Sequence, residues 1–370
     1  MISDYDLTQK LYEISGPVIR WRVSTELMDK TPCDTEQLLQ TVLAHLEVQQ
    51  YIKYYTDGAK QGHSYSYSKM IHGAKPELLE NTAGKLWTLG IRKGISQIDE
   101  FYKPYIDILE QDFYNKNAIR IGYGVYAIAQ FLSLLGYAGE EPISSIMQMR
   151  LEQVYSFVQQ KRYDIYVDVK GYPKLPTSWK RIDKIIDPAL TRYGNAEGEP
   201  PLPSLYDFLG IVGMMQVGMT KENEMKANAI LKYCYDERYQ RDIMYKYGIL
   251  LAPTGNYYSM GWSVHLPGYG QALNKNIEMN KLLLWAEIFS YFSISREFVL
   301  FKDLLDFMEG YRNNNGFYCF LKKFIPEGKR GYFVFGKYMG LGENRMQKEA
   351  CMIESTFRVL RLKKNLGMYS

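Results

Sequence analysis

Apolar and polar positions along this chain recur as a unit of one apolar helix, a short turn and a second, amphipathic helix. Three apolar segments, residues 86–90, 132–136 and 214–218, each end in a glycine, and a polar turn and an amphipathic segment follow. Glycine takes the left-handed conformation after a helix without steric cost. We therefore predict that a helix ends at each of these glycines and that its partner begins just after the turn.

A fourth unit has the same pattern but lacks the glycine. Its first helix is predicted over residues 282–289, its turn near 293–295, and its second helix as far as Met308. Two helices joined by a short turn lie antiparallel and leave one face unburied, so several pairs must stack to cover that face. The repeat predicts an all-α fold, an α/α toroid of helical hairpins in a single domain over residues 1–370.

Both ends of the chain are also predicted to be helical. The N-terminal helices lie within residues 1–75, and Pro17 suits the first turn of one of them. Residues 34–37 have the spacing of a capping box before another helix. The last helix is predicted over residues 346–366.

Residues 162–203 interrupt the helical pattern with a run of glycines and prolines. Within this stretch, residues 165–169 alternate as a short β-strand does. An inset of roughly 40 residues without helices is long for a compact domain and is often functional. A linker between two helical halves is the alternative. We predict a small irregular or β inset here and a second one around residues 331–336.

Two segments between predicted helices, residues 253–269 and 331–345, are rich in glycine and aromatic residues. Loops carry function more often than core elements do. The second segment has the glycine and lysine spacing of a phosphate-binding loop from Gly331 to Lys337. Tyr338 stands where such a loop needs a serine or threonine to hold magnesium, so nucleotide binding is not predicted.

These segments supply most of the candidate site residues. His265 is the first choice for an acid or base, because the pKa of histidine lies nearest neutrality; the alternative is a structural role in its loop. Tyr258 and Glu343 are the other candidate catalytic residues. The candidate ligand-binding residues are aromatic or carry amide or guanidinium groups: Trp87, Trp262, Tyr269, Tyr338, Asn344 and Arg345.

Glu343 and Asn344 have a simpler interpretation as the cap of the last helix, whose free amides they would satisfy. The functional alternative is an anion-binding corner, with Arg345 beside the positive end of that helix. Within the helix, Glu354 and Arg358 are one turn apart and are predicted to form an ion pair.

Composition narrows the function classes without identifying one. The net charge is only +4 and no block of basic residues stands out, so nucleic acid is not a predicted partner. The four cysteines form no Cys-x-x-Cys pair and no two histidines have the spacing of a helical metal site, so no metal is predicted. No uncharged apolar run reaches the roughly 20 residues that cross a bilayer. The polar N-terminus does not resemble a signal peptide, and we expect a cytoplasmic protein. The pattern identifies no cofactor and no oligomeric state.

Aromatic residues are unusually frequent, at 15% of the chain, and 33 residues are tyrosine. Most are expected in helix–helix seams, where tyrosine buries its ring and keeps its hydroxyl at the wet edge. The alternative is an aromatic-lined cavity that stacks on a sugar or faces a cationic intermediate.

The repeats resemble those of the prenyltransferase and squalene-cyclase superfamily of α/α toroids, in an uncharacterised bacterial branch. The resemblance covers most of residues 80–365. It rests on three kinds of segment: the three glycine-ended repeats, the terminal residues 354–362, and the loops 261–268 and 339–345. The resemblance implies the fold, but for each reaction known in this superfamily a sequence motif that the reaction needs is missing. The Asp-x-Asp-Asp, Asp-x-Cys and Gln-x-x-x-Gly-x-Trp motifs are absent, and residues 164–168 are only a weak aspartate-rich candidate.

Three functions follow from these observations. The first is an enzyme or binding protein whose aromatic central cavity takes a hydrophobic or aromatic-stacked small molecule of isoprenoid type. The second is a carbohydrate-active toroid, a lyase or hydrolase, in which Tyr258, His265, Asn344 and Arg345 meet. The third is a non-catalytic scaffold whose repeats present a concave surface to a peptide or protein.

Overall fold

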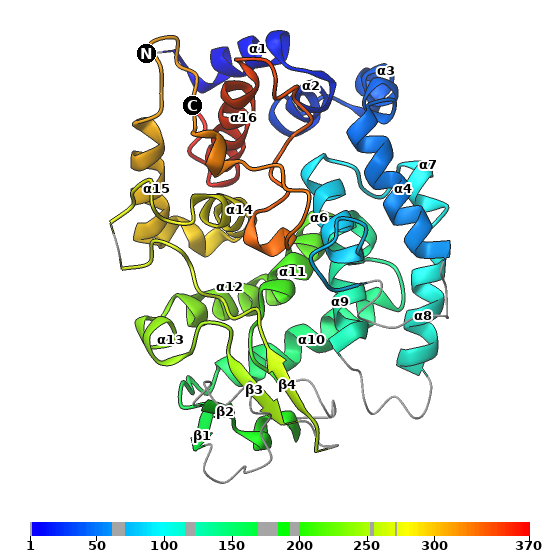
Figure 1. The fold of residues 1–370 in the computed structure, drawn as a ribbon, viewed down its shortest axis with the longest axis vertical. Helices are drawn as coiled ribbons and strands as arrows, with labels where there is room; N and C mark the ends of the chain where they lie inside the picture. The colour runs from blue at the N-terminus through cyan, green and yellow to red at the C-terminus, as the bar shows by residue number, and fades with distance from the viewer. Residues whose placement is uncertain are drawn as a thin grey trace. The chain divides into compact units, whose positions relative to one another are not determined.

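The protein is mostly helical and has a small four-stranded mixed sheet, as Figure 1 shows. The computed structural model describes residues 2–60, 71–114, 123–168, 184–192, 200–251, 255–270 and 272–370. The chain divides into two compact units. Unit 1 consists of Met1–Tyr105 and Leu266–Ser370, and unit 2 consists of Ile106–His265. The helical prediction is confirmed, and the closing of the hairpins into a toroid stays a prediction.

Unit 1 joins the two ends of the chain. Its elements before the boundary are α1 (Asp4–Ile14), α2 (Pro17–Arg22), the π-helix η1 (Val23–Leu27), α3 (Pro32–Leu43), α4 (Leu46–Lys60), α6 (Leu79–Thr88) and α7 (Ser96–Asp99). Helix α8 (Lys103–Tyr114) crosses the boundary. The later elements are α14 (Met279–Phe289), η6 (Ser293–Glu297), α15 (Val299–Glu309), η7 (Lys322–Phe324), η8 (Phe333–Phe335) and α16 (Ala350–Asn365).

Unit 2 is built from two helical hairpins and the sheet. Its helices are α9 (Tyr123–Leu132), the π-helix η2 (Ser133–Tyr137), α10 (Ile143–Val158), η5 (Pro188–Arg192), α11 (Leu205–Val217), α12 (Lys221–Tyr235) and α13 (Glu237–Asp242). Its strands are β1 (Tyr166–Asp168), β2 (Lys184–Ile186), β3 (Gly248–Leu251) and β4 (Tyr257–Met260). Helix α11 packs on α9 and η2, and α12 packs on α10.

The interior of unit 1 consists of helices that are buried on every side. All residues of α6 are buried, as are residues 281–289 of α14 and residues 353–362 of α16. Such helices need internal partners for their polar side chains. Asn81 in α6 illustrates this, because its amide donates to the carbonyls of Gly73 and Lys75 and accepts from Phe333 N–H.

The predicted hairpins appear in the structure. Gly90, Gly136 and Gly218 follow or end their helices with φ of 82°, 99° and 101°, values that favour glycine. The fourth unit is confirmed as α14, the turn at η6, and α15, which ends at Glu309.

The predicted ends of two helices are wrong in detail. The capping box of α3 is formed by Thr31 and Asp34, so Asp34 is the third helical residue and not the cap. Pro32 occupies the first turn and moves the helix start forward. Helix α16 begins at Ala350, with Glu349 at the cap position, so Glu343 and Asn344 do not cap it.

The predicted β inset is part of a larger, four-stranded mixed sheet within the mostly helical fold. Strand β1 pairs antiparallel with β2, β2 runs parallel to β3, and β3 pairs antiparallel with β4. The predicted strand at residues 165–169 is confirmed as β1, while residues 169–183 and 193–199 of the inset lie outside the described residues. Strands β3 and β4 were not predicted, because a four-residue strand is too short for its alternating pattern to stand out in the sequence. The second inset is irregular: Phe333–Phe335 form a 3-10 turn, not a strand.

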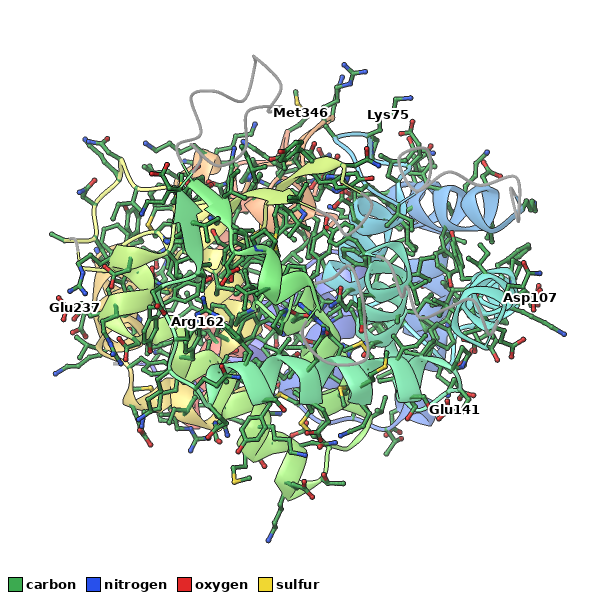
Figure 2. All side chains as sticks on the ribbon, turned by 90° about the horizontal axis from the view of Figure 1, so that it is seen from below. Lys75, Asp107, Glu141, Arg162, Glu237 and Met346 are labelled. Carbon is green, nitrogen blue, oxygen red and sulfur yellow. The ribbon has the colours of Figure 1, made fainter. Side chains whose placement is uncertain are left out.

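None of the helices in the described part of the chain combines the length and apolar composition of a bilayer-spanning segment. Exposed charges lie on the outside of each unit. In Figure 2, for example, the side chains of Glu141 and Glu237 point away from the helices of unit 2.

We predict that unit 2 depends on the close approach of α11 to η2 at Gly213. A Cβ added at Gly213 would lie 2.0 Å from the carbonyl oxygen of Ser133, a backbone atom that cannot move aside alone. Gly213→Ala should therefore lower the free energy of unfolding, measured by urea denaturation, by about 3 kcal/mol. The control Gly139→Ala, where a Cβ meets nothing within 4 Å, should change it by less than about 0.5 kcal/mol. Equal effects of the two substitutions would contradict this packing.

Candidate functional site

Three predicted site residues, Tyr258, Trp262 and His265, lie in unit 2 on β4 and the loop that follows it. Trp262 is partly exposed and stacks on buried Tyr206, with ring centroids 5.4 Å apart and planes 19° apart. Tyr206 stacks in turn on Tyr123 at 5.8 Å. The loop therefore carries a partly exposed indole ring that, among these three residues, is the end member of the stack with Tyr206 and Tyr123.

The backbone around Trp262 has an unusual conformation. Trp262, Lys246 and Tyr247 have φ of 63°, 69° and 47°, and they make up three of the five non-glycine residues with positive φ in the described chain. For bulky side chains this conformation is unfavourable and persists only where the surroundings impose it. Leu205 N–H, which donates to Trp262 O at 2.8 Å, is one such contact. Strain of this kind clusters at functional sites.

His265 joins the two strained segments through a defined set of hydrogen bonds. Lys246 N–H donates to Ser263 Oγ at 2.8 Å, and Ser263 Oγ lies 2.9 Å from His265 Nδ1. His265 Nε2 lies 2.9 Å from the carbonyl oxygen of Ile243, which can only accept. In the neutral imidazole, Nε2 therefore carries the proton and Nδ1 accepts from the serine hydroxyl. Both ring nitrogens are used to hold the loop, and the acid–base role of His265 stays a prediction.

A second chain of hydrogen bonds holds the same loop through Val264. Val264 N–H donates to Tyr239 Oη at 2.9 Å, Tyr239 Oη lies 2.8 Å from Tyr247 Oη, and Tyr247 Oη donates to the carbonyl of Pro203. Because the carbonyl can only accept, the direction of every proton in this chain is set. Burial raises the pKa of both phenols well above the usual value, so the chain stays neutral.

The other predicted residues lie in unit 1 and have separate surroundings. Buried Tyr338 donates to the carbonyl of Gly331 at 3.1 Å. Asn344 Oδ1 accepts from Met346 N–H at 3.0 Å and so closes a local turn. Tyr269, partly exposed, lies in the turn that opens the second part of unit 1.

Glu343, Arg345 and Trp87 lie within the framework of unit 1. Glu343 accepts from Gly16 N–H at 2.7 Å, and burial raises its pKa. Arg345 pairs with Glu354, so the predicted pairing of Glu354 with Arg358 is wrong. Trp87 is buried on α6, and the guanidinium carbon of Arg361 on α16 lies over its ring, 4.9 Å from the ring centroid.

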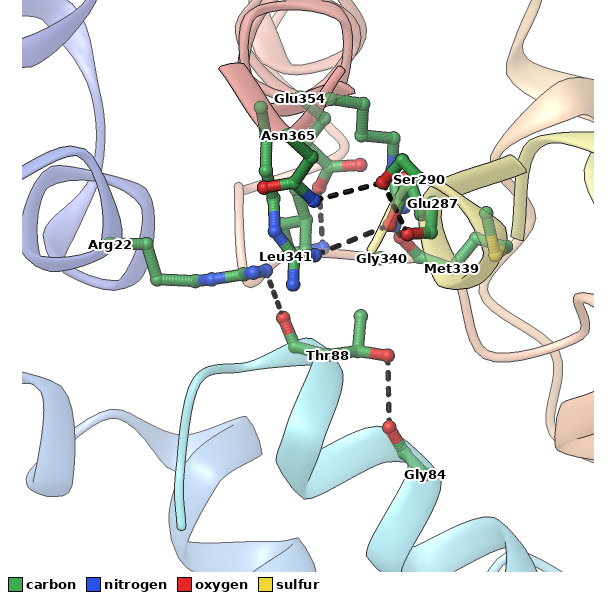
Figure 3. A network of polar contacts seen from close by, with 12 residues as sticks. Arg22, Gly84, Thr88, Glu287, Ser290, Met339, Gly340, Leu341, Glu354 and Asn365 are labelled. Carbon is green, nitrogen blue, oxygen red and sulfur yellow. Dashed lines mark hydrogen bonds and ion pairs between the residues drawn. The ribbon is translucent and has the colours of Figure 1, made fainter. Parts of the chain in front are cut away.

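A network of buried ion pairs connects the helices of unit 1, and Figure 3 shows part of it. Glu26 of η1 accepts from Arg22 Nε at 2.7 Å, from Arg361 Nε at 2.9 Å and from Arg92 Nη2 at 3.2 Å. Glu287 of α14 pairs with Arg358 and, at 3.5 Å, with Arg361. Two turns of α16 are thereby tied to η1 and α14 at once.

Lys85 forms a second buried centre on α6. Its Nζ lies 2.7 Å from Glu47 of α4, 2.7 Å from Glu327 and 2.7 Å from the carbonyl of Gly340. Glu327 also accepts from Gly340 N–H at 2.8 Å. Burial lowers the pKa of Lys85, but the two carboxylates outweigh it, and the net shift is upward. The ammonium therefore stays charged inside the unit.

Sequence reasoning missed the residues of this network, although a signal for them is present. Charged side chains stand inside otherwise apolar helical runs, as Glu287 does within residues 282–289 and Lys85 does just before Leu86 and Trp87. A charge on the buried face of a helix requires a partner of opposite sign. The pattern indicates that partners exist but not which residues supply them.

In the described residues no three His, Cys, Asp or Glu side chains are placed to hold a metal ion. The chain matches no protein-family model, no curated protein and no solved structure. The resemblance to prenyltransferases and squalene cyclases therefore stays a prediction.

Glu354 gives the network a predicted dependence on pH. Its side chain is fully buried, and burial raises its pKa to about 7 against the opposing effects of Arg345, Leu341 N–H, Arg358 and Lys85. The folded protein therefore holds this proton more tightly than the unfolded chain does, whose glutamate pKa is near 4.5. The resulting stabilisation is complete below about pH 4.5 and is lost as the pH rises through 7.

We expect Glu354→Gln to remove this dependence. The free energy of unfolding of the wild type, relative to that of the variant, should fall by about 2 to 3 kcal/mol between pH 5 and pH 8. Urea denaturation at both pH values measures it, and the exposed Glu110→Gln should track the wild type. A difference between wild type and Glu354→Gln that stays constant with pH would show that Glu354 does not titrate there.

Proposed function

We propose that unit 2 is a binding module for a small molecule that stacks on Trp262, and that the ligand is a carbohydrate. The observation that carries the proposal is the partly exposed indole ring, supported by Tyr206 and Tyr123 and held at a positive φ. A pyranose ring presents a flat face of C–H groups that packs on such a ring, while its hydroxyls keep contact with water and polar side chains.

The surroundings of Trp262 support a sugar more than an isoprenoid. An isoprenoid chain needs an enclosed apolar cavity, whereas stacking of a sugar needs only one exposed aromatic face. Tyr258, 53% exposed, and Tyr245, 49% exposed, offer hydroxyls for hydrogen bonding on the segments that flank the loop. The fixed proton directions around His265 and Tyr239 keep the platform rigid, which reduces the entropy lost on binding.

The α/α toroid remains part of the proposal. The hairpin of α9 and α10 and that of α11 and α12 pack on each other within unit 2, as consecutive hairpins of a toroid do. The proposal assigns binding to Trp262 and leaves Asn344 and Arg345 out of the sugar site.

The test is isothermal titration calorimetry of the full chain with cellohexaose, chitohexaose and farnesyl diphosphate. We expect one of the two oligosaccharides to bind, and Trp262→Ala to weaken that binding about tenfold, because the stacking surface is lost. Tyr5→Ala removes an aromatic residue of unit 1 that is 60% exposed and should leave the affinity unchanged.

Two results would contradict the proposal. Binding of farnesyl diphosphate but of neither oligosaccharide would favour the isoprenoid hypothesis. Oligosaccharide binding that Trp262→Ala leaves intact, in a variant whose circular dichroism matches the wild type, would place the sugar elsewhere.

A further inference from the structure

The arginines in the ion-pair network of unit 1 outnumber the carboxylates that serve them. Arg22, Arg92 and Arg361 share Glu26, while Arg358 and Arg361 share Glu287. Four guanidinium groups therefore pair with two carboxylates. Arg22, Arg358 and Arg361 are 3% exposed or less, whereas Arg92 is 30% exposed. The neighbouring carboxyl of Glu354, whose pKa Arg358 helps to lower, pairs with Arg345. Positive charge held inside a protein without an equal negative charge is strongly unfavourable.

Neutral oxygen atoms accept hydrogen bonds from some of the remaining arginine N–H groups, but they do not reduce the excess positive charge. Arg22 donates to the carbonyl of Thr88, as Figure 3 shows, Arg358 donates to the carbonyl of Met339, and Arg361 donates to Tyr291 Oη at 2.6 Å. No ion pair in the described residues links the four arginines to the carboxylates at Lys85.

Three buried N–H donors within or next to this ion-pair network have no hydrogen-bond acceptor in the part of the chain that the structure describes. They are Trp87 Nε1, Arg358 Nε and Arg361 Nη1, the last of which has only the 3.5 Å ion pair with Glu287. The guanidinium carbon of Arg361 lies 4.9 Å from the centre of the Trp87 ring, so two of these donors belong to side chains in direct contact. A buried donor without an acceptor is unfavourable, and most such groups in proteins have a partner.

The pKa values of Arg22 and Glu26 are shifted in the directions that an excess of arginines over carboxylates predicts. Burial, together with the neighbouring charges of Arg361 and Arg92, lowers the pKa of Arg22 even though Glu26 opposes this. Burial would raise the pKa of Glu26, but Arg22 and Arg361 outweigh it and hold the carboxyl well below its usual range. The Glu26 carboxylate is thus already ionised and has no further negative charge to offer.

We propose that the cluster of Trp87, Arg358 and Arg361 binds an anion, an oxyanion of the phosphate class. A water molecule would satisfy the N–H groups but would leave the excess charge in place, whereas an oxyanion supplies both acceptors and negative charge. Arginine is the side chain best suited to such an anion, since its planar N–H groups match oxygen pairs. Free phosphate and the phosphate or sulfate of a larger ligand share this chemistry.

The test is calorimetric titration of the full chain with inorganic phosphate, sulfate and acetate in a zwitterionic buffer of low ionic strength. We expect one phosphate or sulfate per chain and a rise in Tm that exceeds the rise in sodium chloride of equal ionic strength. Trp87→Phe keeps the buried ring but removes one donor, and it should weaken binding at least threefold. The control Trp285→Phe also removes an indole N–H, but one that donates to Val334 O at 2.8 Å, and it should leave binding unchanged.

Three results would contradict the proposal. Binding of acetate alone would indicate a carboxylate ligand and overturn the assignment of a phosphate-class oxyanion. Binding that Trp87→Phe leaves as strong as in the wild type would move the anion to another place. Absence of binding and of any Tm rise beyond that in chloride, a measurement on the wild type that no variant can confound, would overturn the proposal.

Discussion

The ion pairs between α16 and the helices around it are the constraint on which unit 1 depends. Arg358 and Arg361 lie on a helix whose residues 353–362 are all buried, and they form ion pairs with residues far away in the sequence, Glu26 and Glu287. A buried charge that loses its partner is strongly destabilising, which makes the pairing obligatory once the helix is buried. The N-terminal and C-terminal parts of the chain are therefore held in one unit by charge as well as by apolar contact.

Unit 2 is organised by a different means, a set of neutral hydrogen bonds among aromatic and hydroxyl groups. Tyr239 donates to Tyr247, while Tyr247 and His265 donate to backbone carbonyls, and together these bonds fix the loop that carries Trp262. In unit 1, by contrast, charge is concentrated and the aromatic ring of Trp87 lies against a guanidinium group. This contrast is why we assign a stacked neutral ligand to one unit and an anion to the other.

Much of the helical framework follows from the sequence, because helix ends and apolar periodicity are local signals. Gly90, Gly136 and Gly218 mark their helix ends as predicted. The cap of α3 was misplaced because Pro32 moves the helix start. Strands β3 and β4 were missed because four residues are too few for an alternating pattern to stand out, although the two strands pair as neighbours in the chain. The partners of Glu287 and Arg361 are set by tertiary packing alone, so no spacing in the sequence identifies them. Trp262 and His265 were chosen from the sequence because their loop is rich in glycine and aromatic residues, and their functional roles stay predictions.

A double-mutant cycle at Glu287 and Arg358 tests most directly whether carboxylates are limiting in the buried network. Urea denaturation of Glu287→Gln, Arg358→Met and the double variant gives the three free energies of unfolding. If carboxylates are limiting, Glu287→Gln lowers the free energy of unfolding by about 3 to 5 kcal/mol and Arg358→Met lowers it by clearly less. The loss in the double variant is then smaller than the sum of the two single losses by at least about 2 kcal/mol. Free energies that add within about 0.5 kcal/mol, or a greater loss from Arg358→Met than from Glu287→Gln, would contradict it.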